Sequence, residues 1–255
     1  MRMKMVSVTD TGRVRSVNED RAVIQHDVGG YSLAIVADGM GGHQAGDVAS
    51  QMTIDIIREE LKSLSSSMTV EECKLAVKEA IRSTNRKVFE YASAREELQG
   101  MGTTVVVLLA SGQLAVLGHI GDSRAYKISG PSILRLTEDH SLVNELLKNG
   151  QLTPDEAERH PRRNVLTRAL GTEPDAQPDV QHLSLESGDI LLLCSDGLSG
   201  MVDDQTILSI VRGESELEAM AQSLLQAALD AGGDDNITII LASGDSGPAS
   251  GGDPA

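Results

Sequence analysis

The stretch VVVLLASGQLAVLGHIGDSRAYKI, residues 105–128, contains three apolar runs separated by very short returns. The runs are residues 105–110, 114–120 and 125–128. They are continuous in apolar residues instead of alternating, which is typical of strands covered on both faces. The returns are Ser111-Gly112 and Gly121-Asp122-Ser123. Links this short permit only antiparallel neighbours, so the stretch predicts an antiparallel meander inside a sheet.

Further apolar runs extend this pattern along the chain. They predict strands at residues 23–25, 33–37, 190–194 and 237–242. Three segments repeat apolar residues at helical spacing instead, and the second begins with a capping box from Thr69 to Glu72. These predicted helices are residues 45–56, 69–91 and 217–228. The pairing of strands and helices predicts an α+β fold, a four-layer αββα sandwich of two antiparallel β-sheets flanked by helices. A doubly wound parallel sheet is the alternative.

Composition and charge narrow the class of protein. The chain has 255 residues, of which 40% are hydrophobic, and this suits one globular domain. There are 38 acidic and 22 basic residues, giving a net charge of -16. Such a field disfavours binding to nucleic acid. It also repels anionic substrates, so a phosphate handled by this chain would need a local arginine or metal ion.

Two segments differ from the predicted domain, which spans residues 1–243. Residues 139–170 contain short helical patterns, one started by Thr153-Pro154 with Glu156 as capping partner, and we interpret them as an inserted flap. Residues 244–255 are small and polar and predict a disordered tail. The sequence contains no run of about 18 apolar residues and no signal-peptide pattern, so we expect a cytoplasmic protein that does not bind a membrane.

Aspartates stand at the ends of the most apolar predicted strands. They are Asp38, Asp122, Asp196 and Asp235, each beside glycine or another turn former. Taken singly, each is more simply a turn residue than a ligand. Neighbouring antiparallel strands begin and end at the same edge, so all four carboxylates can share one edge of the sandwich. Without cations they would repel one another, and carboxylates with backbone carbonyls suit Mg²⁺ or Mn²⁺ better than zinc.

Six segments carry a family resemblance. They are TDTGRVRSVNEDRA (9–22), VADGMGGH (36–43), GHIGDSRAYKI (118–128), LTRALG (166–171), CSDGLSGMV (194–202) and GGDDNITIIL (232–241). In this order they resemble the motifs of the metal-dependent protein phosphatases, the PPM or type 2C family, in its bacterial form. The resemblance covers residues 5–242. It implies a helix-flanked β-sandwich, a catalytic domain over residues 1–243, and hydrolysis of phosphoserine and phosphothreonine in proteins.

The resemblance implies a metal site built from the strand-end aspartates. Asp38 would bridge two ions, and the backbone carbonyl of Gly39 would bind one of them. Asp196 and Asp235 would bind the other ion. Asp122, together with Asp196, would hold a third. The expected cofactors are therefore two Mn²⁺ or Mg²⁺ ions and a third ion of the same kind.

Other residues would surround these ions. Glu19 and Asp20 would hold water on the metal, and Asn236 would orient Asp235 or such a water. Arg15 resembles the phosphate-binding arginine of the family. An isolated arginine at a strand end is usually solvated, but the NED that follows it favours the phosphate role. Its planar fork of donors suits two phosphoryl oxygens.

The expected mechanism needs no side-chain nucleophile. Two divalent ions can share a water, lower its pKa and place it in line with the phosphorus. Cys194 lacks the arginine-rich loop that a cysteine-dependent phosphatase requires. Animal members of the family have a histidine where this chain has Met40, so His43, three residues further on, is a candidate proton donor to the leaving group, as is a water on the metal.

The predicted function is therefore dephosphorylation of serine and threonine in proteins, opposing Ser/Thr kinase signalling. Expected partners are phosphorylated proteins, including a Ser/Thr kinase, and the chain is expected to be a monomer. Two alternatives remain. One is a two-metal phosphoesterase acting on a small phosphometabolite, and the other is a sensor that binds phosphoproteins without turnover.

Overall fold

The computed structural model describes residues 3–41 and 45–244, and within this range the chain forms two antiparallel β-sheets. The five-stranded sheet has the order β1 (Met3–Asp10), β11 (Ile237–Gly244), β10 (Ile190–Cys194), β7 (Arg124–Ser129) and β8 (Ser132–Arg135). The six-stranded sheet has the order β2 (Asp20–Val28), β3 (Tyr31–Met40), β5 (Val105–Ser111), β6 (Leu114–Ile120) and β9 (Asp179–Ser184), with β4 (Gly102–Thr103) paired to β3. All these described pairings are antiparallel, so the doubly wound alternative is wrong.

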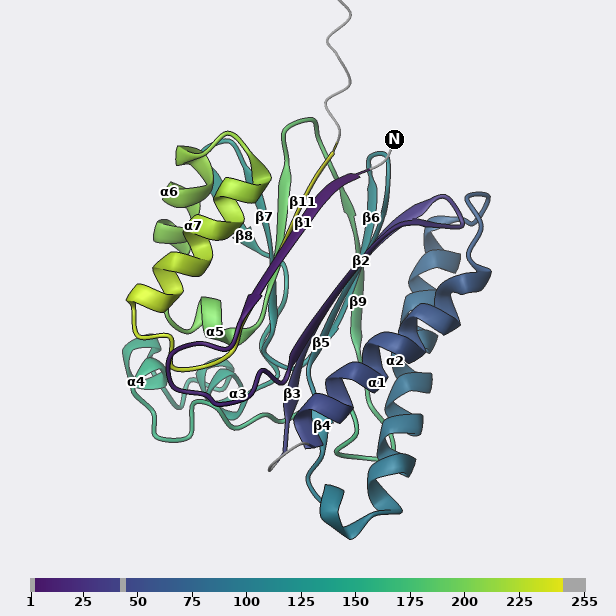
Figure 1. Cartoon of the computed structure of the whole chain (residues 1–255), viewed down its shortest axis with the longest axis vertical. Coiled ribbons are helices and arrows are strands. Elements are labelled where there is room, and N and C mark those ends of the chain that lie inside the picture. The colour runs from purple at the N-terminus through teal and green to yellow at the C-terminus, as the bar shows by residue number, and fades with distance from the viewer. Residues whose placement is uncertain (1–2, 42–44, 245–255) are drawn as a thin grey trace, which may run out of the picture.

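Helices cover the outer face of each sheet (Figure 1). The six-stranded sheet is covered by α1 (Ala45–Glu60) and α2 (Val70–Ser93), which are followed by the short 3-10 helices η1 (Leu61–Ser63) and η2 (Glu96–Leu98). The five-stranded sheet is covered by α5 (Asp196–Ser199), α6 (Asp204–Gly213) and α7 (Leu217–Asp230). The predicted α+β sandwich of four layers is confirmed, as is the capping box of Thr69 and Glu72 at the start of α2.

Three apolar cores separate the four layers. Consecutive residues of one strand enter different cores: Ile35 packs toward α1 and α2, while Val36 packs between the sheets. Ile239 and Ile240 divide in the same way on the five-stranded sheet. All four side chains are fully buried. Strands with a core on both faces need apolar residues at every position, which explains why these runs are continuous.

Four strands were not predicted: the two-residue strand β4, which pairs with β3, and three strands at sheet edges. β1, β8 and β9 each pair with one neighbour only in the described sheets. Their residues alternate or are largely exposed, as in β8, where three of four residues are exposed. An edge strand with one wet face lacks the continuous apolar run that marked the interior strands.

The predicted meander is only half correct. β5 and β6 form the expected antiparallel hairpin, but β7 pairs with β10 and β8 in the other sheet. The chain passes between the sheets at Gly121, whose φ is +108°, and a Cβ there would lie 2.6 Å from Cβ of Thr104. A short link requires only that consecutive strands be close, and stacked sheets satisfy this as well as paired strands do.

The segment interpreted as a flap contains two short helices. α3 (Leu142–Lys148) and α4 (Pro154–Glu158) lie in it, and α4 begins with the predicted capping box of Thr153 and Glu156. The segment leaves and rejoins the sandwich at one place, because the Thr167 N–H donates to the His140 carbonyl at 2.8 Å. Its role as a flap stays a prediction.

The two ends of the described chain add little to these expectations. Gly244, predicted as the start of the tail, still belongs to β11, and the remainder of that predicted tail lies outside the described residues. Among the helices that the structure describes, none combines the length and apolar character needed to cross a bilayer.

Candidate active site

Asp38 lies in β3 where the strand passes from pairing with β5 to pairing with β4. The Asp38 N–H donates to the Thr104 hydroxyl at 3.2 Å. Its carbonyl accepts hydrogen bonds from the Thr103 hydroxyl at 2.8 Å and from the Thr104 N–H at 2.9 Å. Thr104 is itself bonded through its hydroxyl to Ser123 at 2.7 Å. The Asp38 carboxylate is therefore carried on a firmly held main chain.

Asp20 faces Asp38 directly across the β2–β3 ladder, so the two side chains are neighbours on one face. Asp20 is 2% exposed. Its Oδ2 accepts a hydrogen bond of 2.7 Å from the hydroxyl of Ser195, which follows β10 in the other sheet. Its Oδ1 is buried and has no hydrogen-bond partner among the described residues. The Asp20 carboxylate thus links the two sheets through Oδ2, and its Oδ1 is available to another ligand.

Asp196 and Asp235 come from the ends of two neighbouring strands, β10 and β11. Asp38 is among the groups that shift the pKa of Asp196. Asp20, Asp122, Asp196 and Asp235 all act electrostatically on Asp38. The structure therefore brings the four predicted strand-end aspartates together, and Asp20 joins them. We call these five residues the acidic cluster.

Burial and mutual repulsion shift the protonation of this cluster. The pKa of Asp38 lies well above its ordinary range, because of burial and then because of the charges of its neighbours, Asp20 first. The pKa values of Asp20 and Asp122 are raised to about 7, again by burial and then by nearby carboxylates. Buried carboxylates this close to one another need protons or cations between them to offset their repulsion. Together with the unpartnered Oδ1 of Asp20, this all-oxygen donor set fits hard divalent ions.

Gly39 and Gly46 let β3 and the start of α1 approach closely. A Cβ on Gly39 would lie 2.0 Å from the Gly46 carbonyl oxygen, and a Cβ on Gly46 would lie 2.7 Å from Oε1 of Glu19. This Oε1 is a second buried oxygen without a described hydrogen-bond partner. Burial raises the pKa of Glu19, in opposition to the nearby charge of Arg15. Glu19 therefore lies beside Gly39, and its outer position at a metal site stays a prediction.

Arg15 lies at the rim of the cluster. One of its terminal nitrogens donates to Oδ2 of Asp235 at 2.7 Å, and its side chain is 50% exposed. The guanidinium therefore contacts one of the carboxylates that the sequence predicts to be metal ligands. Its exposure leaves it accessible to an anion from solvent.

Asn236 differs from the first of its two predicted roles, which was to orient Asp235; the second, orienting a water on the metal, stays a prediction. Its side-chain nitrogen donates to the carbonyls of Thr11 and Val17, each at 2.9 Å, and its Oδ1 accepts from the Glu19 N–H at 2.8 Å. Only its backbone N–H donates to Asp235, at 2.8 Å. The side chain shapes the loop between β1 and β2 and does not orient Asp235, because its donors and acceptor are taken by that loop.

Three further positions complete the comparison with the sequence. His43, the candidate proton donor, lies outside the described residues. Met40 ends β3 and pairs with Gly102. Burial raises the pKa of the Cys194 thiol to about 12, which agrees with the expectation that it is no nucleophile. Ser195 was not predicted as a site residue, although it directly precedes Asp196 in the CSDG motif.

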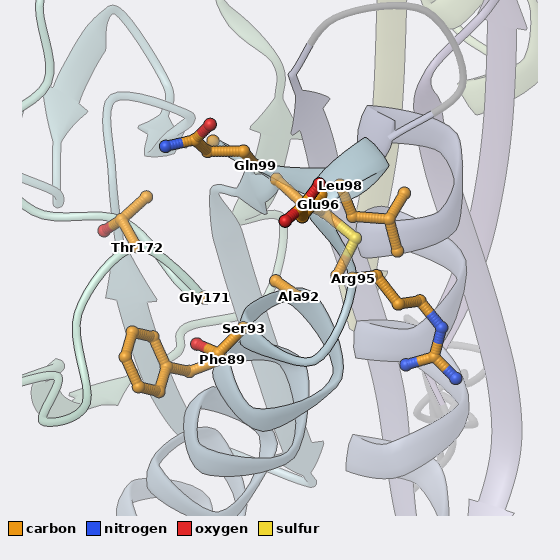
Figure 2. A pocket seen from close by; sticks show the side chains of 11 residues that line it. Phe89, Ala92, Ser93, Arg95, Glu96, Leu98, Gln99, Gly171 and Thr172 are labelled. Atoms are coloured by element: carbon orange, nitrogen blue, oxygen red, sulfur yellow. The ribbon is translucent and has the colours of Figure 1, made fainter.

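A pocket of about 710 Å³ opens beside the acidic cluster. Asp122 and Asp196 line it, together with Arg124 and with Asn144 and Arg163 of the flap segment. A second pocket, of about 780 Å³, lies at the end of α2 (Figure 2) and has none of the predicted site residues in its wall. Only the first of these two pockets gives access to the cluster.

Comparisons with known proteins identify the family of this chain. The family model described as Protein phosphatase 2C matches residues 11–231. The serine/threonine phosphatase stp of Listeria welshimeri is 39% identical over 233 residues, which cover 91% of this chain and 92% of that protein. The structure of the S. agalactiae serine/threonine phosphatase has a TM-score of 0.90 at 37% identity, covering 94% of this chain and 99% of that chain. The catalytic domain of the phosphatase PstP in complex with 2 manganese ions has a TM-score of 0.82 at 33% identity, covering 95% and 98%. The chain therefore belongs to the protein phosphatase 2C family.

Proposed function

We propose that this chain hydrolyses phosphoserine and phosphothreonine in proteins, using two Mn²⁺ or Mg²⁺ ions at the acidic cluster and a third ion at Asp122 and Asp196. The observation that carries the proposal is the cluster itself, in which burial and mutual repulsion raise the pKa values of Asp20, Asp38, Asp122 and Asp196. Cations would remove that repulsion. The manganese in the PstP structure and the names of the relatives support the same reading.

Each part of the chain has a distinct task in this proposal. Bound divalent ions would lower the pKa of a water and direct it at phosphorus. Asp38 holds the centre of the cluster from the six-stranded sheet, and Asp196 and Asp235 approach it from the five-stranded sheet. Arg15 would exchange its bond to Asp235 for two phosphoryl oxygens. The pocket beside Asp122 would receive the protein segment that carries the phosphate.

The proposed substrates are phosphorylated proteins, including a Ser/Thr kinase. The family and the pocket of about 710 Å³ beside the cluster support a protein substrate, and the kinase stays a prediction. The monomeric state and the cytoplasmic location stay predictions.

A direct test measures hydrolysis of a phosphothreonine peptide and of a sugar phosphate after chelation and during a Mn²⁺ titration. The proposal expects no peptide hydrolysis in the chelated protein, recovery with Mn²⁺, and a clear preference for the peptide. Full activity after thorough chelation would contradict metal dependence. A preference for the sugar phosphate would instead favour the phosphometabolite alternative.

A further inference from the structure

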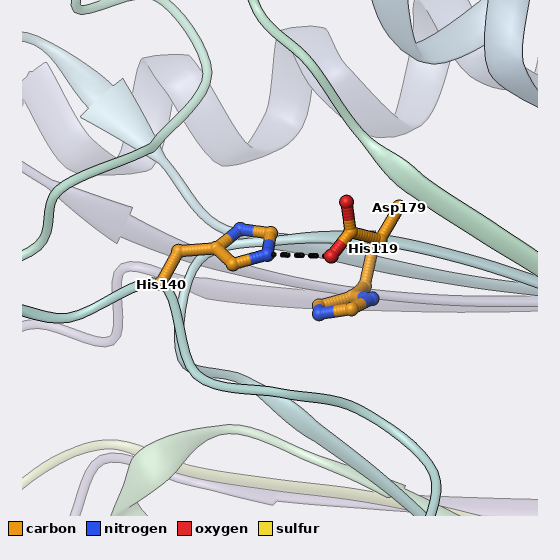
Figure 3. Close-up of side chains that lie close together, drawn as sticks. All are labelled: His119, His140 and Asp179. Carbon is orange, nitrogen blue, oxygen red and sulfur yellow. Dashed lines mark hydrogen bonds and ion pairs between the residues drawn. The ribbon is translucent and has the colours of Figure 1, made fainter. Parts of the chain in front are cut away.

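A second group of titratable side chains lies next to the acidic cluster. It consists of His119 on β6, His140 at the base of the flap segment, and Asp179 on β9 (Figure 3). One nitrogen or oxygen atom from each residue lies within 4.8 Å of the others, and the imidazole rings stack with centroids 4.7 Å apart. Spacing alone would allow a metal ion here.

The hydrogen bonds of His140 point to another role. Its Nδ1 accepts the backbone N–H of Gly121 at 3.1 Å, so this nitrogen carries no proton. Burial lowers the pKa of His140 to about 4, so the ring is neutral near pH 7. The ring proton is then on Nε2, which donates to Oδ2 of Asp179 at 3.1 Å. Both nitrogens are occupied, and a metal ion would have to displace one of these partners.

Gly121 is bound by His140 twice. Besides the bond to Nδ1, the Gly121 carbonyl accepts the backbone N–H of His140 at 2.9 Å. Thr104 packs against Gly121, and its hydroxyl bonds the hydroxyl of Ser123 at 2.7 Å. The residues before and after Asp122 are therefore both fixed, at the point where the chain crosses from one sheet to the other.

Asp179 determines which nitrogen of His140 faces Gly121. Its Oδ1 accepts from Arg168 at 3.2 Å, and its Oδ2 accepts from Nε2 of His140. A carboxylate held in this way keeps the proton on Nε2 and leaves Nδ1 as an acceptor. A continuous series of hydrogen bonds thus runs from Arg168 through Asp179 and His140 to Gly121.

We propose that His140 is a positioning residue that holds Asp122, through Gly121, where the third ion binds. This inference rests on the proposed function. Loss of the Nδ1 acceptor leaves the buried Gly121 N–H unpaired and loosens the link that carries Asp122. The ion at Asp122 and Asp196 is then bound more weakly, while the pair of ions at Asp38 is retained.

Two substitutions distinguish the roles of the two ring nitrogens of His140. An asparagine places its amide oxygen near the position of Nδ1, whereas a glutamine places its amide near Nε2. His140→Asn therefore keeps an acceptor for Gly121, and His140→Gln keeps only the partner of Asp179. The exposed His182 on β9 offers a matched control, His182→Gln.

The experiment is Mn²⁺ titration calorimetry on the full chain, with hydrogen exchange of the Gly121 amide measured in the metal-free protein. We expect three ions in the wild type and a third-site affinity about 10- to 100-fold weaker in His140→Gln, with the first two affinities unchanged. The Gly121 amide should exchange faster in this variant. His140→Asn and His182→Gln should resemble the wild type in both measurements. Asp179→Ala keeps Nδ1 of His140 but no longer fixes the ring proton on Nε2. This variant should lower the affinity of the third site by a smaller factor.

Other outcomes overturn the inference in identifiable ways. Equal weakening by His140→Asn and His140→Gln, or an unchanged third site in both His140→Gln and Asp179→Ala, contradicts the positioning role alone. If His140→Gln does not fold, as judged by circular dichroism and melting, Asp179→Ala and His140→Asn still decide the question. A wild type that binds only two ions also contradicts the positioning role but leaves the proposed function standing. A wild type that binds no Mn²⁺ contradicts the proposed function itself.

Discussion

The metal-free protein should lose stability as the pH rises, and Asp20 allows the size of this effect to be worked out. Its pKa is about 7 in the folded chain, against 3.8 ordinarily, because it is buried and lies near Asp196 and Asp235. Below pH 3.8 both the folded and the unfolded chain hold the proton, and no penalty arises. Between pH 3.8 and about 7 only the unfolded chain releases it, so the free energy of unfolding falls. Above pH 7 the full penalty, about 4 kcal/mol, is present.

Replacing Asp20 by Asn removes this titration. The amide still accepts the Ser195 hydroxyl but leaves polar hydrogens in a buried site, which costs about 1–3 kcal/mol at every pH. We therefore expect metal-free Asp20→Asn to be more stable than the wild type by about 2 kcal/mol at pH 8, and to lose this advantage by pH 4. Excess Mn²⁺ should reverse the order, since an ion at 100 times its Kd stabilises the folded wild type by about 2.7 kcal/mol.

The assay is urea unfolding in chelator at several pH values between 4 and 8, repeated with Mn²⁺. Asp175→Asn, at an exposed position, is the matched control and should follow the wild type throughout. A stability difference between Asp20→Asn and the wild type that does not change with pH would refute the reasoning. So would a metal-free wild type whose stability rises relative to the variant between pH 4 and 7.

Three further predictions concern catalysis. Asp38→Asn should lower kcat by at least about 100-fold, because it weakens the charge at the centre of the cluster, while the melting temperature stays within a few degrees. Near wild-type turnover at saturating Mn²⁺ would contradict the bridging role of Asp38. Arg15→Ala should raise KM for a phosphopeptide about tenfold or more with a smaller change in kcat, because the arginine would bind the phosphate in the ground state and the transition state alike. A loss of kcat alone would mean that Arg15 binds the phosphate in the transition state only. Asp122→Ala should lower kcat more for phosphothreonine peptides than for aryl phosphates, because the leaving group of an aryl phosphate needs little protonation. Equal losses of kcat on both substrates would exclude a role of Asp122 in protonating the leaving group.

The interior of the sandwich could be predicted from sequence because its strands lie between two cores. Ile35 and Val36 are both fully buried, and such runs stand out in any window. β8 and β9 could not be found in this way, because their exposed residues resemble those of loops. α6 was also missed, although Asp203 caps it by accepting the Thr206 N–H at 2.9 Å, and this capping pair is visible in the sequence.

The candidate site was predictable where its residues stand at strand ends and not where contacts cross the fold. Asp38 and Asp196 follow apolar runs, so their position was evident from the order of residues. The bonds from Ser195 to Asp20 and from Gly121 to His140 join segments that are distant in sequence or belong to different layers. Nothing in local spacing indicates such pairs, because they depend on which sheet each strand enters.

The acidic cluster draws its members from both sheets, and this has a consequence for motion. Asp20 and Asp38 belong to the six-stranded sheet, while Asp196 and Asp235 flank strands of the five-stranded sheet. In the described chain the backbone ladders run within each sheet, so the layers are held together here by side chains. Ions shared by these carboxylates would act as a clasp at this end of the sandwich. The two sheets could then separate at this end only when an ion dissociates, so the dissociation rate of Mn²⁺ would measure how often the sandwich opens there.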